Sequence, residues 1–315
     1  MTLDRREFMV QAAAGLLVSK AVLAAAPLKP GAAASAPARA FGLRYTLASC
    51  LYGTLPLAQI VPEAPKTGAD TVDLWPRIHG NQREQLDEMG HDAFRALLEK
   101  HKVRLGILTR YDLGPLKLKD ELAVAQKLQC PLIVTGAGGK NGLAGADLKA
   151  AVLALGESLK PTLAQAEQCG VTVAIENHSG QLLHSADGVR WLLEAVPSPR
   201  LGLALAPYHL PQQPDELARL IRDAGARLAH FYAWEHGKGC MVKMPKQEEL
   251  QQLPGRGRLD FSPLLAALKA TSYRGAVSVF MHPVPRGVPI LGTVAEVTAE
   301  VNRARKYLEA CLARS

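Results

Sequence analysis

Several features that would assign a function directly are missing from this 315-residue chain. No G-x-G-x-x-G follows an early apolar run and no G-x-x-x-x-G-K-[ST] is present, so the usual nucleotide-binding loops are absent and we expect no nucleotide cofactor. The five cysteines include no C-x-x-C pair, which excludes a zinc ribbon and a thioredoxin-like site. The net charge is +8, but no run of Lys and Arg stands out, so we expect no nucleic-acid partner.

The chain has one extended apolar stretch, near its start, and this stretch has fewer residues than a membrane span needs. Arg5 and Arg6 precede an Ala-rich run that Lys20 interrupts, whereas a membrane span needs about 20 apolar residues. Paired arginines before a moderately apolar run are typical of a twin-arginine export signal. We therefore predict a signal over residues 1–26, a Pro/Ala-rich spacer over 27–40, a periplasmic location and no membrane attachment after cleavage.

The rest of the chain alternates between short apolar runs and amphipathic stretches. This alternation predicts strand–helix units and a parallel sheet. Eight such units in about 275 residues predict a single-domain (β/α)8 TIM barrel over residues 41–315, with a doubly wound open sheet as the alternative. The expected strands are residues 44–48, 71–74, 104–108, 132–135, 171–175, 201–205, 228–233 and 276–280.

The strongest site signal is the stretch VTVAIENHSG, residues 171–180. Five apolar or β-branched residues predict a strand buried on both faces, and Glu176 follows directly at its carboxyl end. Ligands bind at the carboxyl ends of parallel strands, so Glu176 is the first candidate for a catalytic residue. The alternative is an exposed glutamate at a strand end.

Polar and aromatic side chains follow the other expected strands in the same way. We predict catalytic roles for Glu176, His209 and His282. Indoles can stack on a sugar ring, imidazoles and carboxylates can bind its hydroxyls, and a cation can clamp a carboxylate or phosphate. The predicted substrate-binding residues are Trp75, His79, Trp234, Glu235, Lys238 and Arg286.

Five segments together resemble the xylose isomerase-like TIM barrels, a group that includes sugar epimerases, sugar isomerases and the endonucleases that act at abasic sites. The segments are GADTVDLWP, AIENHSG, LALAPYHL, HFYAWEHGKG and GRGRLDFSPLLAALKATSYRGAVSVFMHP, and the resemblance covers about residues 41–311. In the epimerases of this group, Glu, Asp, His and Glu at the ends of strands five to eight hold a divalent metal, and two of these carboxylates move protons.

The match to that metal site is partial. Glu176 corresponds to the first ligand, but Ala206 stands where the group has Asp, while His209 keeps the histidine of the Asp-x-x-His pattern. The third ligand falls on Tyr232 or, with a two-residue shift, on His230. The fourth falls on Phe280 or on His282. The resemblance therefore implies a possible Mn, Zn, Fe or Co site formed by Glu176, His209, His282 and His230.

The resemblance implies an enzyme that abstracts a proton next to a carbonyl of a sugar or keto-sugar, as an isomerase, an epimerase or a related lyase. Its small-molecule substrate would be a sugar. The alternative is a carbohydrate-binding barrel that has lost catalysis, because two of the four expected ligands are replaced. A nuclease acting on damaged DNA is a third hypothesis, and the predicted export argues against it. The sequence leaves the oligomeric state open.

Overall fold

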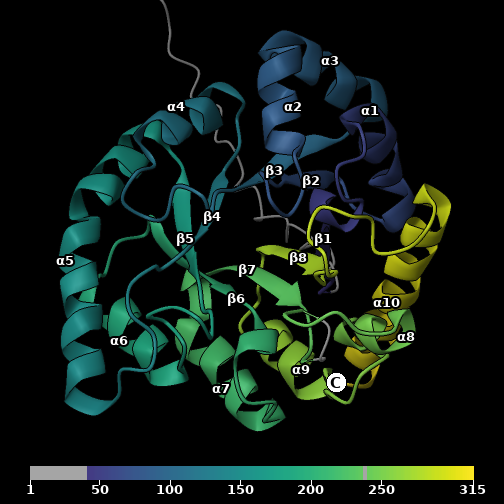
Figure 1. Ribbon diagram of the computed structural model, residues 1–315. Coiled ribbons are helices and arrows are strands. Elements are labelled where there is room, and N and C mark those ends of the chain that lie inside the picture. Colours follow the sequence, from purple (N-terminus) through teal and green to yellow (C-terminus); the bar gives the residue numbers. More distant parts are fainter. Residues whose placement is uncertain (1–40, 237–239) are drawn as a thin grey trace, which may run out of the picture. The chain divides into compact units, whose positions relative to one another are not determined.

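The computed structural model describes residues 41–236 and 240–315, which form a closed barrel of eight parallel strands (Figure 1). Each strand pairs with its neighbours in chain order, and β1 pairs with β8 to close the barrel. The predicted (β/α)8 fold is confirmed. The strands are β1 Arg44–Ala48, β2 Thr71–Leu74, β3 Arg104–Thr109, β4 Leu132–Gly136, β5 Thr172–Glu176, β6 Leu201–Leu205, β7 Leu228–Ala233 and β8 Ala276–Val279.

Helices surround the barrel as an outer layer (Figure 1). In the part of the chain that the structure describes they are α1 Leu57–Ile60, α2 Gln82–Met89, α3 His91–His101, α4 Lys119–Lys127, α5 Gly145–Cys169, α6 Ala186–Ala195, α7 Pro214–Ala224, α8 Lys246–Glu249, α9 Ser262–Ala270 and α10 Val294–Arg314. None of these described helices has both the length and the apolar character needed to cross a bilayer.

The helix boundaries follow local sequence chemistry. The side chain of Ser185 caps α6 by accepting a hydrogen bond from the Gly188 amide at 3.1 Å, and Thr293 caps α10 by accepting one from the Glu296 amide. Residues 56–67, which the sequence predicts as one helix, form α1 and two 3-10 turns that carry Pro62 and Pro65 at their starts. A proline removes a backbone donor and so interrupts a continuous helix.

Two register shifts disturb the regular pairing of the strands. One lies between Val72 and Asp73 where β2 pairs with β3, and the other lies between Leu203 and Ala204 where β6 pairs with β7. Such irregularities change the direction in which a strand presents its side chains, and they occur often beside active sites. The first of them lies directly beside Asp73, whose side chain is fully buried.

The middle of the barrel interior is more polar than is usual for this fold. TIM barrel interiors are filled mainly by bulky branched side chains. Here His230 and Ser278 are both fully buried and share a hydrogen bond of 3.0 Å, and Asp73 accepts one of 2.8 Å from Thr109. This polar layer lies among apolar strands such as β4 and β6, whose residues are all buried.

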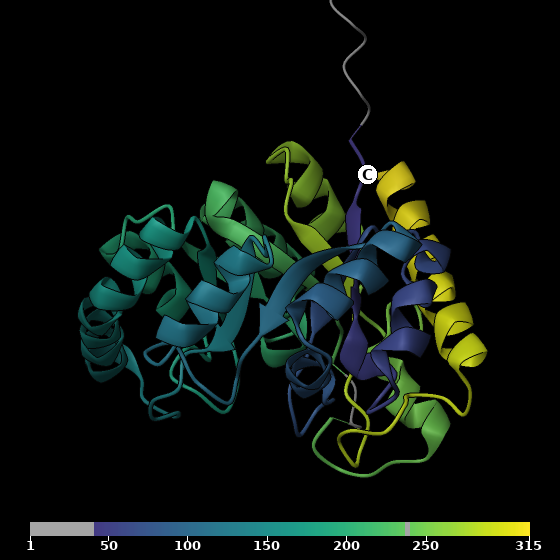
Figure 2. The same cartoon turned by 90° about the horizontal axis from the view of Figure 1, so that it is seen from above.

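The connections that follow β7 and β8 lie at the end of the barrel toward which the strands point. Figure 2 shows α8 and the loop from β8 to α10 at this end, whereas α10 finishes at the opposite end. Side chains that follow successive parallel strands are therefore gathered at one mouth. The predicted signal and spacer, residues 1–40, lie outside the described residues.

Candidate functional site

A cavity of about 60 Å³ lies at the carboxyl ends of the strands. That is room for about four to six water molecules at roughly 10–15 Å³ each, the scale of a small ligand. Seven residues predicted from the sequence line it: Trp75, His79, Glu176, His209, Trp234, His282 and Arg286. Three further residues, Tyr111, His178 and Cys240, complete the lining.

Glu176 ends β5 and is 3 % exposed. The hydroxyl of Tyr111 donates a hydrogen bond to Oε2, and Oε1 lies 3.6 Å from Nε2 of His209. Burial raises the pKa of Glu176 to about 8, and the nearby charge of Asp73 adds to this, although the Tyr111 hydrogen bond opposes it. A carboxylic acid whose pKa lies near the working pH can both release and accept a proton.

Asp73 is a second buried carboxyl group that the sequence analysis did not single out. Its Oδ2 accepts a hydrogen bond of 2.7 Å from Nε1 of Trp75, and its Oδ1 accepts one of 2.8 Å from Thr109. Burial raises the pKa of Asp73 to about 8 despite these two hydrogen bonds. The only sequence signal was an acid within the strand TVDL, where a charged side chain needs a specific partner.

His209 is held by two neighbouring loops. Its Nδ1 lies 3.1 Å from the hydroxyl of Ser179, and its ring lies 3.9 Å from the ring of His178. The amide of Asn177 fixes Ala206, three residues before His209, by bonding both its N–H and its carbonyl, at 2.8 and 2.9 Å. Burial lowers the pKa of His209 to about 2, so this imidazole is neutral, and its Nε2 has no hydrogen-bond partner among the described residues.

His282 forms another wall of the cavity. Its backbone N–H and carbonyl both bond the amide of Gln252, at 3.3 and 2.9 Å, and the same amide accepts a hydrogen bond of 3.0 Å from Trp234. The ring lies 4.5 Å from the ring of His79 and its Nδ1 has no hydrogen-bond partner. Burial lowers the pKa of His282 well below its usual value, so it too is neutral.

The two indoles form rigid walls rather than open stacking platforms. Trp75 and Trp234 are each 1 % exposed. Trp75 stacks on Tyr111 and Phe280 at 5.9 and 5.2 Å, and Trp234 stacks on Tyr208 at 4.1 Å. Because aromatic rings already occupy these faces, the two indoles limit the size of the cavity.

Two predicted site residues of the described chain, Glu235 and His230, are not among those that line the cavity. Glu235 is turned away from it: its carboxylate accepts a hydrogen bond of 2.9 Å from the Leu259 amide, and burial raises its pKa to about 7 while backbone N–H groups oppose the rise. His230 lies within the barrel, bonded to Ser278. Both were predicted from their nearness to a strand end, which does not specify the direction of a side chain. Lys238 lies outside the described residues.

The donors present do not fit the four-ligand metal site that the resemblance implies. Among residues 41–236 and 240–315, no three His, Cys, Asp or Glu side chains come together in an arrangement that could hold an ion. Among the four predicted ligands, Glu176 and His209 lie 3.6 Å apart while His230 bonds Ser278 inside the barrel, and Ala206, Tyr232 and Phe280 carry no carboxylate or imidazole. The structure therefore does not bring together the four metal ligands predicted from the resemblance, which are Glu176, His209, His282 and His230.

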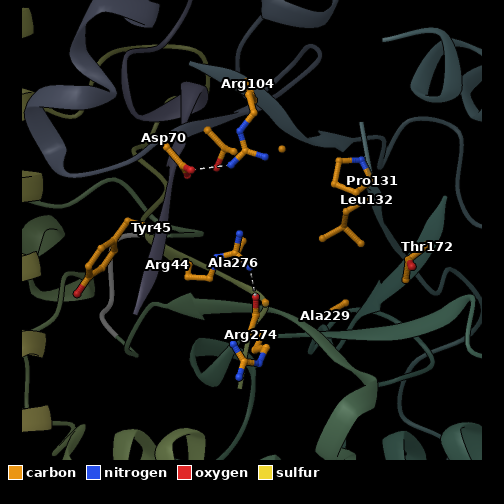
Figure 3. Close-up of a pocket in the computed structure, with 13 residues that line it drawn as sticks. Arg44, Tyr45, Asp70, Arg104, Pro131, Leu132, Thr172, Ala229, Arg274 and Ala276 are labelled. Atoms are coloured by element: carbon orange, nitrogen blue, oxygen red, sulfur yellow. Dashed lines mark hydrogen bonds and ion pairs between the residues drawn. The ribbon is translucent and has the colours of Figure 1, made fainter. Parts of the chain in front are cut away.

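A larger cavity, of about 250 Å³, lies at the opposite end of the barrel (Figure 3). Arg44, Arg104 and Arg274 surround it at the starts of strands or just before them. Arg104 pairs with Asp70 at 2.6 Å, with both side chains 64 % exposed, and Arg44 donates to the Arg274 carbonyl at 3.1 Å. Active sites of TIM barrels lie at the carboxyl end, so this cavity is not the candidate for the reaction.

The fold and the cavity can now be compared with known proteins. The xylose isomerase-like TIM barrel family matches residues 61–307. This chain belongs to that family. A curated member that it resembles, the D-psicose 3-epimerase of Enterocloster bolteae, is 25 % identical over 114 residues, which is 35 % of this chain and 34 % of that protein. The alignment thus spans about a third of the relative's length.

Solved structures of the family share the fold. The D-psicose 3-epimerase of Clostridium cellulolyticum H10, determined with D-tagatose, is 17 % identical with a TM-score of 0.64, and the match covers 86 % of this chain and 99 % of that one. The IOLI protein, determined with a bound zinc atom, is 16 % identical with the same TM-score and the same coverage. At these identities the likeness establishes the barrel, and the chemistry must come from the cavity itself.

Proposed function

We propose that the protein is a sugar isomerase or epimerase that transfers a proton at a carbon next to a carbonyl. The observation that carries this proposal is Glu176, a buried carboxyl group that faces a small cavity, has a pKa of about 8 and lies 3.6 Å from a neutral imidazole. Proton transfer beside a carbonyl needs a base of this kind and a hydrogen-bond donor for the oxygen that becomes negative.

In the proposed reaction the ionised Glu176 takes the proton from the carbon. The electron pair of the broken C–H bond forms a C=C bond, and the carbonyl oxygen becomes an enolate. Nε2–H of His209, in the tautomer whose Nδ1 accepts from Ser179, donates to that oxygen. A neutral imidazole is suited to this role, because its N–H can polarise a carbonyl without a permanent charge.

The proton then returns to a carbon, and its destination defines the product. Return from Glu176 to the former carbonyl carbon gives isomerisation, in which Nε2 of His209 also gives its proton to the enolate oxygen and takes one from the hydroxyl on the carbon that lost its hydrogen. Return to the same carbon from the other face gives epimerisation; a ring N–H of His282, on a second wall of the cavity, supplies this proton, and His282 regains a proton from Glu176, so that both groups end as they began. Loss of a leaving group from the enolate instead gives the related elimination. No step passes through a metal, because the donor set does not fit one.

The second candidate is a carbohydrate-binding barrel without catalysis. Ala206 and Phe280 favour it, because they carry no acid where the family's epimerases have one. For either function we propose that the protein works in the periplasm, since Arg5 and Arg6 with the Ala-rich run that follows are typical of a twin-arginine signal.

Exchange of carbon-bound hydrogen with solvent separates the two candidates. Ketoses, aldoses and sugar acids are incubated with the protein in D2O, and deuterium uptake is followed by NMR. We expect uptake beside the carbonyl of at least one sugar, and a loss of about 1,000-fold or more in Glu176→Gln, which keeps shape but removes the base. Glu235→Gln is the matched control, because that buried carboxyl binds backbone rather than the cavity. Tight sugar binding without any exchange would establish the second candidate.

A further inference from the structure

Arg286 is the one cation in the described lining of the cavity, and most of its hydrogen-bonding capacity is unused. It follows β8 and is half-buried. One Nη donates to the Pro283 carbonyl at 3.0 Å and the other donates to Sγ of Cys240 at 3.1 Å. A guanidinium has five N–H donors. Three of them therefore make no hydrogen bond to the described residues and are available to a ligand.

Three other half-buried arginines of the described chain make three hydrogen bonds each. Arg190 binds three carboxylates at 2.6 to 3.1 Å and Arg110 binds two. Arg227 has no acidic partner, but it donates to three backbone carbonyls. Arg286 has neither arrangement, since no carboxylate of the described residues pairs with it. Its counter-charge has to come from outside the described protein.

The acids near the cavity do not supply that counter-charge at neutral pH. Burial raises the pKa values of Glu176 and Asp73 to about 8, so both carboxyls are largely protonated. Burial also lowers the pKa values of His79 and His178, and the charge of Arg286 lowers both further.

We infer that this cavity takes a sugar acid whose single carboxylate is seated on Arg286. The inference rests on the proposed function and names the substrate class for it. A carboxylate matches the planar fork of a guanidinium with two parallel hydrogen bonds. One cation also balances one carboxylate, whereas a phosphate monoester carries about −1.5 to −2 charges. With the carboxylate held at Arg286, the rest of the molecule extends toward Glu176 and His209, which line the same cavity.

Paired ligands that differ only in the acid group test this inference on the full-length purified protein. The probes are hexuronates against the corresponding hexoses, glycerate against glycerol, and a hexose 6-phosphate. Binding is measured by calorimetry, with NMR of the histidine rings for weak ligands. We expect at least one carboxylate to bind about 10- to 100-fold more tightly than its neutral partner, as a hydrogen-bonded charge pair predicts.

Three variants locate the effect. Arg286→Met removes the charge but keeps the length, and it should abolish the preference for the acid while leaving binding of the neutral partner unchanged. Arg286→Lys keeps the charge without the fork and should recover part of the preference. Arg274→Met, at the other end of the barrel, should change neither (Figure 3).

The outcomes separate this inference from the proposed function. Acid binding that depends on Arg286, without deuterium exchange, supports the sugar-acid site and overturns the isomerase. Exchange on a neutral sugar that Glu176→Gln abolishes and Arg286→Met leaves intact supports the isomerase and overturns the sugar acid. Tighter binding of the phosphate, or no binding of any carboxylate up to about 100 mM, also overturns it.

Discussion

The cavities at the two ends of the barrel differ in volume and in the burial of their charged side chains. Volume alone would select the wrong cavity as the candidate site. The cavity at the starts of the strands is the larger, about 250 Å³ against about 60 Å³ at the carboxyl ends. Its charged groups are exposed, as in the pair of Arg104 with Asp70. The smaller cavity faces Glu176 and His209, whose side chains are 4 % and 2 % exposed. Removal from water, rather than volume, is what distinguishes the cavity at the carboxyl ends.

This difference has a simple physical origin. A charge that stays in water interacts weakly with its neighbours, whereas a buried group must become neutral or find a partner. At the carboxyl ends, burial raises the pKa values of two carboxyls toward neutrality and holds several imidazoles uncharged. The two carboxyls can then exchange protons near neutral pH, while the imidazoles stay neutral and act as hydrogen-bonding groups. Substitutions at the two ends should consequently have very different effects.

After the loss expected for Glu176→Gln, the largest effect should come from His209. Replacing it with Phe keeps a ring in the wall but removes the donor to the developing enolate, so kcat should fall about 100- to 1,000-fold. Arg104→Met at the other end should leave kcat unchanged. Steady-state kinetics on a substrate found by deuterium exchange give the comparison. Equal losses in both variants would mean that the two ends do not differ in function.

The titration of Glu176 should change kcat/KM about tenfold for each unit of pH. The base acts in its ionised form, and burial sets its pKa at about 8. The rate kcat/KM should therefore rise about tenfold per unit of pH below 8 and level off above it. A pH profile at constant ionic strength measures this. A rate that is flat between pH 6 and 8 would contradict the assignment of Glu176 as the base.

Asp73 should make the fold less stable as the pH rises. Its folded pKa, about 8, lies above its unfolded value of about 4, so its stabilising contribution is complete below pH 4 and is lost as the pH rises through 8. The side chain of Asp73→Asn stays neutral at every pH. This variant should therefore lack the fall in the free energy of unfolding, on the order of a few kcal/mol between pH 6 and 9, that Asp73 causes. Denaturant unfolding across this range measures the slope, with the exposed Asp120→Asn as the control.

A smaller effect is expected at the N-terminal end. Arg104 and Asp70 form an ion pair whose side chains are each 64 % exposed, and exposed pairs contribute about 0–1 kcal/mol. Arg104→Met should thus change the free energy of unfolding by less than about 1 kcal/mol, and added salt should reduce the difference. A loss of several kcal/mol would show that this end is more strongly coupled to the core than its exposure implies.

The smallest effect should come from removing metal. The described donors do not assemble a three-ligand site, so dialysis against a chelator should leave turnover within about twofold, and added Mn, Zn, Fe or Co should not raise it. Elemental analysis before and after dialysis accompanies the assay. Activity lost on chelation and restored by one metal would show that ligands outside the predicted set complete a site.

The barrel could be predicted because its strands are read from local sequence. Apolar runs such as residues 201–205 specify buried strands, and all eight strands were found, four with the observed bounds and four with bounds that differ by one residue. The helices α2 and α8 were missed. Each is short, and neither has the repeating apolar pattern that identifies a longer helix.

The site was predicted less completely, because a sequence does not give side-chain directions. Glu176 and His209 were found because they lie at or just beyond the carboxyl ends of two strands. Asp73 was missed because it lies inside a strand, and a register shift beside it affects its direction. Gln252 was missed because a long connection returns it to the barrel, where it bonds β7 and β8 loops alike. Contacts across such distances come only from the fold.

Gln252 also divides the connection between β7 and β8 into two parts with different tolerance to change. Its buried amide ties Trp234 to His282, so the wall of the cavity is fixed from residue 249 onward. Earlier in the same connection, Met241 and Val242 are 74 % and 62 % exposed. Residues 241–248 should accept insertions and exchanges that change which molecules enter, while the reacting groups keep their positions. New specificities could be grafted here without rebuilding the barrel.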